Sequence, residues 1–153
     1  MKRVVIRRRD ETIMIIACPG CGANNRLPAA RLNEAARCPK CKTALAPVSA
    51  PIELTSEAEF ADLIGSSPLP VVVDFWAEWC GPCRVVAPEL KKVATQTAGR
   101  VVVAKVNTEV LRGVAQRYGI ESIPTLIKFS GGREQARLSG ARPAPGIIAG
   151  LGL

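Results

Sequence analysis

Two cysteines three residues apart, Cys80 and Cys83, stand where a strand-like segment changes into a helical one. The apolar run 71–75 has the length and residue types of a buried strand, and a helical pattern follows Cys83. The start of a helix favours a thiolate on the first cysteine, and Pro82 suits the first turn because its missing donor costs nothing there. The pair could therefore close and reopen a small disulfide. It could also be half of a zinc site, because a lone C-x-x-C motif does not distinguish the two.

The other four cysteines form two more C-x-x-C pairs near the start of the chain. They are Cys18 and Cys21, then, after sixteen residues, Cys38 and Cys41. Two such turns aim four sulfurs at one point, which is typical of structural zinc, and the absence of histidine removes mixed-ligand sites. So short a segment cannot bury enough apolar surface to fold alone, so the metal would supply much of its folding free energy. We predict one structural zinc per chain; two metal-free redox pairs or an iron centre are the alternatives.

The full string WCGPC at 79–83, after a strand that contains an aspartate, resembles the active site of thioredoxins. The string NRLP at 25–28, after the first cysteine pair, is similar to the thioredoxin 2 type, the branch of that family with an N-terminal zinc module. The resemblance extends over about residues 14–145. It implies the thioredoxin fold and a protein-disulfide reductase that works by dithiol–disulfide exchange.

Asp74 lies within the apolar string VVVDF, where burial of an unpaired carboxylate is costly and should raise its pKa. It could instead stand at the strand end and reach water. The resemblance implies a buried acid beneath the cysteines that assists proton transfer. Lys105, in the string VVVAKVN, matches the family lysine near that acid, and an ordinary strand-edge lysine is the alternative.

Pro124 matches the thioredoxin loop whose proline is cis and faces the disulfide, although nothing local to the sequence predicts a cis bond. The resemblance implies that the backbone beside this proline pairs with an extended substrate segment by strand addition. It also implies a substrate-binding rim around the cysteines, formed by Trp79, Gly81, Pro82, Ile123, Gly140 and Ala141.

The expected mechanism begins with attack of the Cys80 thiolate on a substrate disulfide. Cys83, expected to be the less exposed cysteine, then resolves the mixed disulfide with help from Asp74. The resemblance implies that an NADPH-dependent thioredoxin reductase regenerates the dithiol. The chain would then need no organic cofactor of its own.

Strand and helix signals alternate along the second part of the chain. Strands are expected at 52–54, 71–75, 101–106, 125–129 and 133–139, with a hairpin turn at 130–132. Helices are expected after a capping box at Ser56 and Glu59, from the cysteines to about residue 97 with a kink at Pro88, and over 108–118 before Gly119. The glycines and prolines of the last segment leave room for only a short helix. This pattern predicts an α/β protein with a mixed central sheet flanked by helices, preceded by a small zinc-ribbon-like module.

Four segments follow from these signals. We expect a basic N-terminal extension at 1–13, a four-cysteine zinc module at 14–45, a linker at 46–51 and a thioredoxin domain at 52–153. The linker lies within the uncharged, proline-containing stretch 43–51.

The net charge of +8 is concentrated near the start of the chain. Residues 1–50 hold ten Lys and Arg against three Asp and Glu, a difference of +7, whereas residues 51–153 hold eleven against ten, a difference of +1. A basic head is typical of nucleic-acid binding, but this head has no aromatic residue for base stacking. Nearby cations would also offset the net −2 charge of a four-thiolate zinc site. The pattern therefore argues against nucleic acid.

The composition indicates a cytoplasmic protein. The longest apolar run is far too short to cross a membrane, which argues against a membrane partner. Asp10 and Glu11 interrupt the basic start, and the apolar segment 13–17 is shorter than the core of a signal peptide. Six cysteines in C-x-x-C pairs fit metal and redox chemistry in a reducing compartment. We expect a monomer.

Two other functional classes are compatible with these motifs. A disulfide isomerase or oxidase usually has a different dipeptide between its cysteines, and Gly81-Pro82 argues against it. A zinc-ribbon module that binds protein or nucleic acid, on an inactive thioredoxin-like scaffold, would not need the complete WCGPC string. Oxidants attack thiolates, so the zinc site is either a redox-responsive switch or a purely structural ribbon, and the sequence leaves both open.

Overall fold

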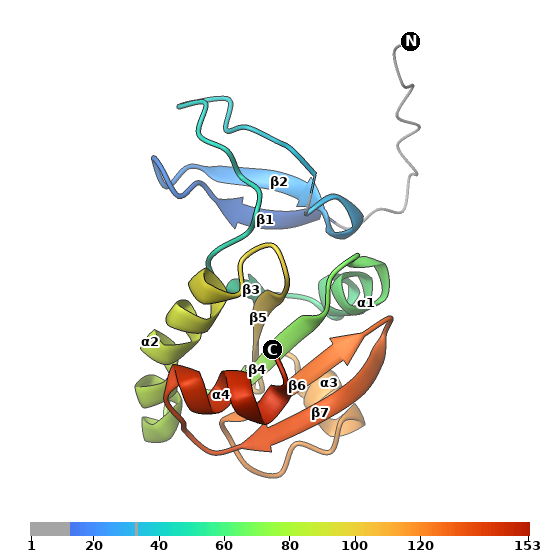
Figure 1. Cartoon of the computed structure of the whole chain (residues 1–153). Coiled ribbons are helices and arrows are strands. Elements are labelled where there is room, and N and C mark those ends of the chain that lie inside the picture. Colours follow the sequence, from blue (N-terminus) through green and yellow to red (C-terminus); the bar gives the residue numbers. More distant parts are fainter. Residues whose placement is uncertain (1–12, 33) are drawn as a thin grey trace.

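The computed structural model describes residues 13–32 and 34–153, so all but the last residue of the predicted basic extension lies outside the described residues. A five-stranded mixed sheet forms the centre, in the order β3-β5-β4-β6-β7 (Figure 1). Its strands are β3 (Ile52–Leu54), β5 (Val102–Asn107), β4 (Val71–Trp76), β6 (Thr125–Ser130) and β7 (Arg133–Ser139). The first three are parallel, and β6 and β7 are antiparallel to their neighbours.

Helices cover both faces of this sheet, because alternate residues of the strands are apolar on both sides. The helices are α1 (Glu57–Ser66), α2 (Gly81–Gln96), α3 (Arg112–Arg117) and α4 (Ala144–Leu151). Val73 and Phe75 pack in one core with residues of α1 and α3, whereas Val72 packs in the other with residues of α2 and α4. Asp74, between Val73 and Phe75, therefore faces α2. The predicted mixed α/β sheet and thioredoxin fold are confirmed.

Local sequence signals correctly predict where most of the helices and strands begin or end. Ser56 caps α1, since its hydroxyl accepts from the Glu59 N–H at 3.1 Å, while the Glu59 carboxylate accepts from the N–H of Thr55 at 2.7 Å rather than from that of Ser56. Gly131 and Gly132 both have positive φ, as a two-residue hairpin turn requires. The last helix is short, as predicted.

The predicted helix over 108–118 is wrong in its first turn, because α3 begins only at Arg112. The Asn107 side chain accepts from the N–H of Glu109 at 2.9 Å, and the Asn107 carbonyl accepts from the N–H of Leu111 at 2.9 Å. These bonds form a separate turn before the helix. Gly119 follows α3 with φ +60°, the left-handed conformation expected just past a helix end.

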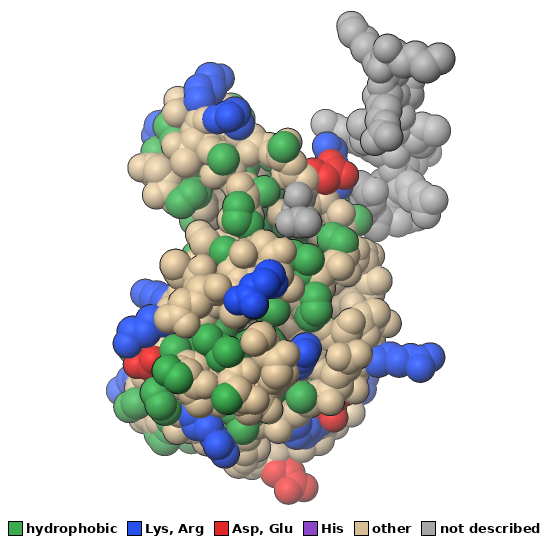
Figure 2. Space-filling view, viewed as in Figure 1, with side chains coloured by type: hydrophobic (Ala, Val, Ile, Leu, Met, Phe, Trp, Pro, Cys, Tyr) green, Lys and Arg blue, Asp and Glu red, His purple; other side chains and the backbone are tan. Residues whose placement is uncertain are grey.

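The N-terminal module contains a hairpin that the cysteine spacing did not predict. Its antiparallel strands are β1 (Ile13–Ala17) and β2 (Asn24–Pro28), and a short 3-10 turn, η1 (Ala29–Arg31), follows. Alternate residues of β1 are buried, and Met14 and Ile16 join the hydrophobic core that contains α1 and β3. The module forms a smaller lobe on the larger body (Figure 2).

The predicted linker is packed against the body. Val48 is buried in the same core as Met14, and the Ser49 carbonyl accepts from the Thr95 hydroxyl near the end of α2. In the part of the chain that the structure describes, no helix is both long and apolar enough to cross a membrane.

Candidate active site and metal site

Cys80 and Cys83 form a disulfide at the start of α2, with their Cα atoms 5.3 Å apart. Cys80 is the cap residue of the helix, and its Sγ accepts from the Cys83 N–H at 3.2 Å. This contact and the helix dipole favour negative charge on the Cys80 sulfur. The expectation that Cys83 is the less exposed cysteine is not confirmed, since both residues are almost fully buried, with exposed fractions of 3% for Cys80 and 4% for Cys83. Position at the helix end, rather than exposure, distinguishes the two sulfurs.

The loop before β6 lies against this disulfide. The Ile123–Pro124 peptide bond is cis, as the resemblance implied, and the Ile123 carbonyl oxygen lies 3.7 Å from the Cys80 Sγ. The Pro124 carbonyl accepts from the N–H of Gly140 at 2.9 Å, which brings the end of β7 beside the loop. The structure thus brings together segments from three distant parts of the chain.

Trp79 is the most prominent side chain around the cysteines, with 67% of its surface exposed. Its indole N–H donates to the Glu109 carboxylate at 2.7 Å. Glu109 was not predicted, because only the fold brings the turn after β5 next to residue 79. The other predicted rim residues at the surface are Gly81, Pro82, Gly140 and Ala141, while Ile123 is half-buried.

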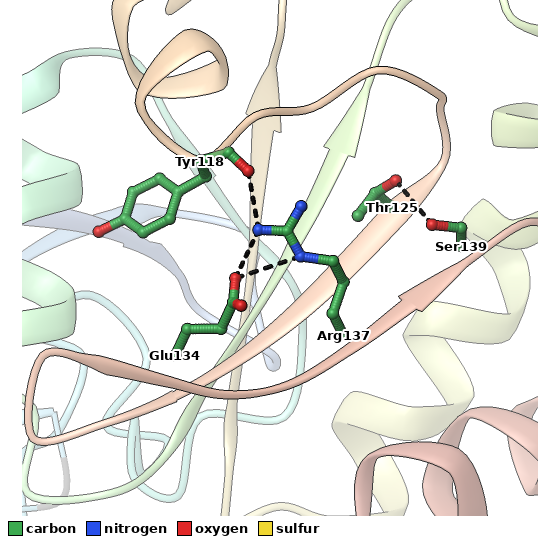
Figure 3. A network of polar contacts seen from close by, with 5 residues as sticks. All are labelled: Tyr118, Thr125, Glu134, Arg137 and Ser139. Carbon is green, nitrogen blue, oxygen red and sulfur yellow. Dashed lines mark hydrogen bonds and ion pairs between the residues drawn. The ribbon is translucent and has the colours of Figure 1, made fainter.

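A polar network holds the loop and the neighbouring strands in place (Figure 3). The Arg137 guanidinium on β7 donates to the Tyr118 carbonyl at 2.7 Å, at the end of α3, and pairs with the Glu134 carboxylate. Directly after Pro124, the Thr125 hydroxyl donates to the Ser122 carbonyl at 2.6 Å. Both ends of the loop 119–124 are therefore fixed to the sheet.

Asp74 is completely buried on the α2 side of β4. Among the described residues, neither of its carboxylate oxygens has a hydrogen-bond partner. Burial raises the pKa of Asp74 to about 7, while the charge of Lys105 opposes this and that of Glu53 adds to it. The alternative of a solvent-exposed strand-end aspartate is wrong.

We predict that this buried carboxyl makes stability depend on pH. Folded Asp74 keeps its proton up to about pH 7, whereas the unfolded group loses it near 3.8, so stability falls as the pH rises between these values. The variant Asp74→Asn has no ionisable group at this position, so its stability does not fall in this way as the pH rises. Its free energy of unfolding relative to that of the oxidised wild type should increase by roughly 4 kcal/mol between pH 4 and pH 8. Urea unfolding at both pH values measures the difference, and a constant difference contradicts the prediction.

Lys105 lies beside Asp74, because the two residues are partners in the parallel register of β4 and β5. Its ammonium lies 4.6 Å from the centre of the Trp76 ring, and the Trp76 indole N–H donates to the Glu53 carboxylate at 3.2 Å. Glu53 was not predicted as a site residue. The alternation Ile-Glu-Leu indicated only that it faces away from its two buried neighbours.

The four remaining cysteines meet at one point of the N-terminal module. All four Sγ atoms lie within 4.8 Å of one another; Cys18 and Cys41 are 3.5 Å apart and Cys21 and Cys38 are 3.7 Å apart. A zinc–sulfur bond of about 2.3 Å in a tetrahedron gives sulfur–sulfur distances of about 3.8 Å. The cluster therefore fits a tetrahedral zinc ion.

The two cysteine turns have the same backbone hydrogen bonds, which explains this convergence. The Cys18 N–H donates to the Ala23 carbonyl and the Cys38 N–H to the Thr43 carbonyl, each at 2.9 Å. Each turn also has one residue with positive φ at the same place, Gly22 in the first and Lys42 in the second. The same backbone geometry in both turns directs two sulfurs from each turn toward one point.

A disulfide at the start of a helix, a facing cis-proline loop and a carboxyl buried on the same side of the sheet as that helix define a thiol–disulfide oxidoreductase with the thioredoxin fold. The thioredoxin family model matches residues 51–152. Thioredoxin C-3 of Corynebacterium nephridii is 45% identical over 84% of this chain and 86% of its own length, and a thioredoxin of Synechocystis is 49% identical over 58% of this chain and 82% of its own. A solved mutant thioredoxin from Halobacterium salinarum, 28% identical, aligns with a TM-score of 0.62 over 68% of this chain and 88% of its own.

The chain belongs to the thioredoxin family. Members of this family act on disulfide substrates, are reduced by thioredoxin reductase and need no organic cofactor. The match with thioredoxin C-3 extends over more of the chain than the family model does, so the similarity includes part of the N-terminal module.

Proposed function

We propose that this chain is a cytoplasmic, monomeric protein-disulfide reductase whose reacting groups are Cys80 and Cys83. The observation that carries the proposal is the disulfide at the start of α2, with the Cys80 sulfur 3.7 Å from the Ile123 carbonyl oxygen. An extended substrate segment that pairs with the backbone of Ile123 would bring its own disulfide to Cys80. Trp79, Gly81, Pro82, Gly140 and Ala141 would form the surface around it.

The reaction needs two exchange steps. The Cys80 thiolate attacks one sulfur of the substrate disulfide and displaces the other as a thiolate, which gives a mixed disulfide. Cys83 then loses its proton and attacks the Cys80 sulfur, so the substrate leaves with both sulfurs reduced and the Cys80–Cys83 disulfide forms. Two electrons pass to the substrate, and an NADPH-dependent thioredoxin reductase would restore them.

Asp74 is proposed as the acceptor of the Cys83 proton, because it lies on the α2 side of β4 and its pKa of about 7 lets it change charge at neutral pH. Lys105 would stabilise the charged form. Asp74→Asn removes the acceptor and keeps its shape, so the resolving step should slow by roughly a hundredfold at pH 7. Rapid-mixing measurements of mixed-disulfide decay test this, and decay at the wild-type rate would leave Asp74 as a structural residue only.

The cysteine cluster is proposed to hold one structural zinc. Cys18, Cys21, Cys38 and Cys41 would be its ligands, and the metal would cross-link the two turns of the module rather than take part in catalysis. The cluster lies outside the active site and offers four ligands, which leaves no open position for a substrate. We propose the module at 14–45, the linker at 46–51 and the thioredoxin domain at 52–153 as the division of the chain.

Insulin reduction tests the proposed activity. The protein, NADPH and a thioredoxin reductase should together precipitate reduced insulin and consume NADPH, and omission of any one of them should stop both. A metal assay on the same sample should give about one zinc per chain. NADPH consumption no faster than without the protein would overturn the reductase assignment.

A further inference from the structure

Three charged side chains form a row across three neighbouring strands. Glu53 on β3 pairs with Lys105 on β5, and Lys105 pairs with Asp74 on β4. Partners in a parallel sheet project to the same face, and here that face is covered by α2. From the edge of the sheet inward, Glu53 is exposed, Lys105 is half-buried and Asp74 is fully buried.

Trp76 fixes the outer part of this row. It lies two residues after Asp74 on the same strand and therefore on the same face. Its N–H donates to the Glu53 carboxylate at 3.2 Å, and the Lys105 ammonium lies 4.6 Å from the centre of its ring. The indole thus holds the carboxylate while its face attracts the ammonium.

Two adjoining hollows meet at Lys105, the middle residue of the row, and one of them reaches Cys83. A cavity of about 270 Å³ is lined by Cys83, Trp76 and Lys105, among others. An open groove of about 460 Å³ is lined by Glu53 together with the same Trp76 and Lys105. Lys105 therefore stands between the resolving cysteine and the surface position of Glu53.

The charged groups around the row are few. Glu78 lines both hollows and Arg84 lines the one at Cys83, while Lys91 lines a third hollow that also reaches Lys105. On the other side of β4, the partner of Asp74 is Leu126, which brings no charge. Lys128 on β6 faces the same side two residues beyond Leu126, but its ammonium donates to the Gly152 carbonyl at 3.1 Å. Among the described residues, Lys105 and Glu53 are therefore the groups on neighbouring strands whose charges act on Asp74.

We propose that Glu53 is a positioning residue that tunes the proton affinity of Asp74 by holding the positive charge of Lys105 toward the edge of the sheet. The effect of Glu53 on catalysis rests on the proposed function, in which Asp74 accepts the proton of Cys83. Glu53 favours protonated Asp74 in two ways. Its own negative charge disfavours the ionised carboxylate of Asp74, and its attraction for the Lys105 ammonium competes with the attraction of Asp74 for the same ammonium. Loss of either effect makes Asp74 a stronger acid.

Titration of the Asp74 carboxyl tests the proposal without any catalytic step. In oxidised protein labelled with carbon-13 at aspartate carboxyls, the Asp74 signal can be assigned by its loss in Asp74→Asn. The variant Glu53→Gln keeps an oxygen for the Trp76 N–H and should lower the Asp74 midpoint by about half a pH unit, whereas Lys105→Met should raise it by about one unit. Asp62→Asn removes a half-buried charge from α1, outside the row, and should leave the midpoint unchanged.

An Asp74 midpoint in Glu53→Gln equal to that of wild type overturns the proposal, as does a shift of the same size in Asp62→Asn. The pH profile of mixed-disulfide decay is a separate measurement. Midpoints that move in opposite directions in Glu53→Gln and Lys105→Met support the charge row whatever the decay shows. A decay profile that does not follow them would count against Asp74 as the proton acceptor, and thus against the proposed mechanism alone.

Discussion

Replacing Cys80 with serine is expected to lower the rate of disulfide reduction by about a thousandfold or more. Serine is close in size, but its hydroxyl is not ionised at neutral pH and cannot form a mixed disulfide. Cys80 caps α2, and its sulfur accepts the Cys83 N–H, so the reactive thiolate should form there. Insulin reduction measures the loss, and an unchanged zinc content of the same sample shows that the remainder of the protein is intact.

Cys83→Ser is the matched variant, because it removes the other sulfur of the same disulfide. Attack by Cys80 should survive while resolution is lost, so a mixed disulfide should accumulate. Mass spectrometry under non-reducing conditions should find the protein joined to one substrate chain, and dithiothreitol should release it. Multiple turnovers by Cys83→Ser at the wild-type rate would contradict the two-cysteine mechanism.

The reacting groups could be predicted from the sequence because residues close to them in the chain determine their positions. A strand followed directly by a helix brings Cys80 and Cys83 within one turn, and the apolar neighbours of Asp74 indicate its burial. The cis bond before Pro124 had no local signal, and it was implied by the resemblance to the family alone. The pairing of β6 and β7 then brings Gly140 to this loop.

Contacts between distant segments could not be predicted in this way. Glu53 and Lys105 are ordinary surface residue types, and only the register of β3 and β5 makes them neighbours. Glu109 contacts Trp79 because the turn after β5 replaces the first turn of the expected helix. Each of these contacts depends on strand order, which a single sequence leaves open.

The packing of the N-terminal module into the core of the body was also not predicted from the sequence. The sequence predicted a separate module joined to the domain by a linker at 46–51, yet Met14, Ile16 and Leu32 are buried in the same core as Phe60 and its neighbours. The module thus completes the core on the side of α1 and β3. Zinc binding and folding of the body are therefore expected to be coupled, since the first of the two cysteine turns that would hold the metal joins β1 to β2.

The module lies far from the cysteines that react. Ser49 contacts Thr95 near the end of α2, whereas Cys80 caps its start, and the 16 residues of α2 make a helix about 24 Å long. The two ends are at opposite sides of the body (Figure 1). Release of zinc would not uncover Cys80 directly, so we expect it to act first on stability, which favours a structural ribbon over a switch.

Removal of zinc is expected to destabilise the whole chain. Full burial of a large apolar side chain contributes about 1.5–3 kcal/mol, so loss of the packing of Met14, Ile16 and Leu32 should cost about 3–8 kcal/mol after allowance for residual structure in the unfolded chain. For a chain of this size the melting temperature should fall by about 10 °C or more. Calorimetry of the protein with and without a chelator measures this.

Two variants separate loss of metal from other effects of the treatment. Cys38→Ser removes one of the buried sulfurs and should reproduce the fall in melting temperature without chelator, whereas Ala35→Ser adds the same hydroxyl at an exposed position nearby and should not. Because the module and body share one core, unfolding of the metal-loaded protein should be a single transition. A body that melts at the same temperature with and without zinc would contradict this prediction and show that the module folds independently. A redox switch at the zinc site would then have to act without changing the stability of the active-site domain.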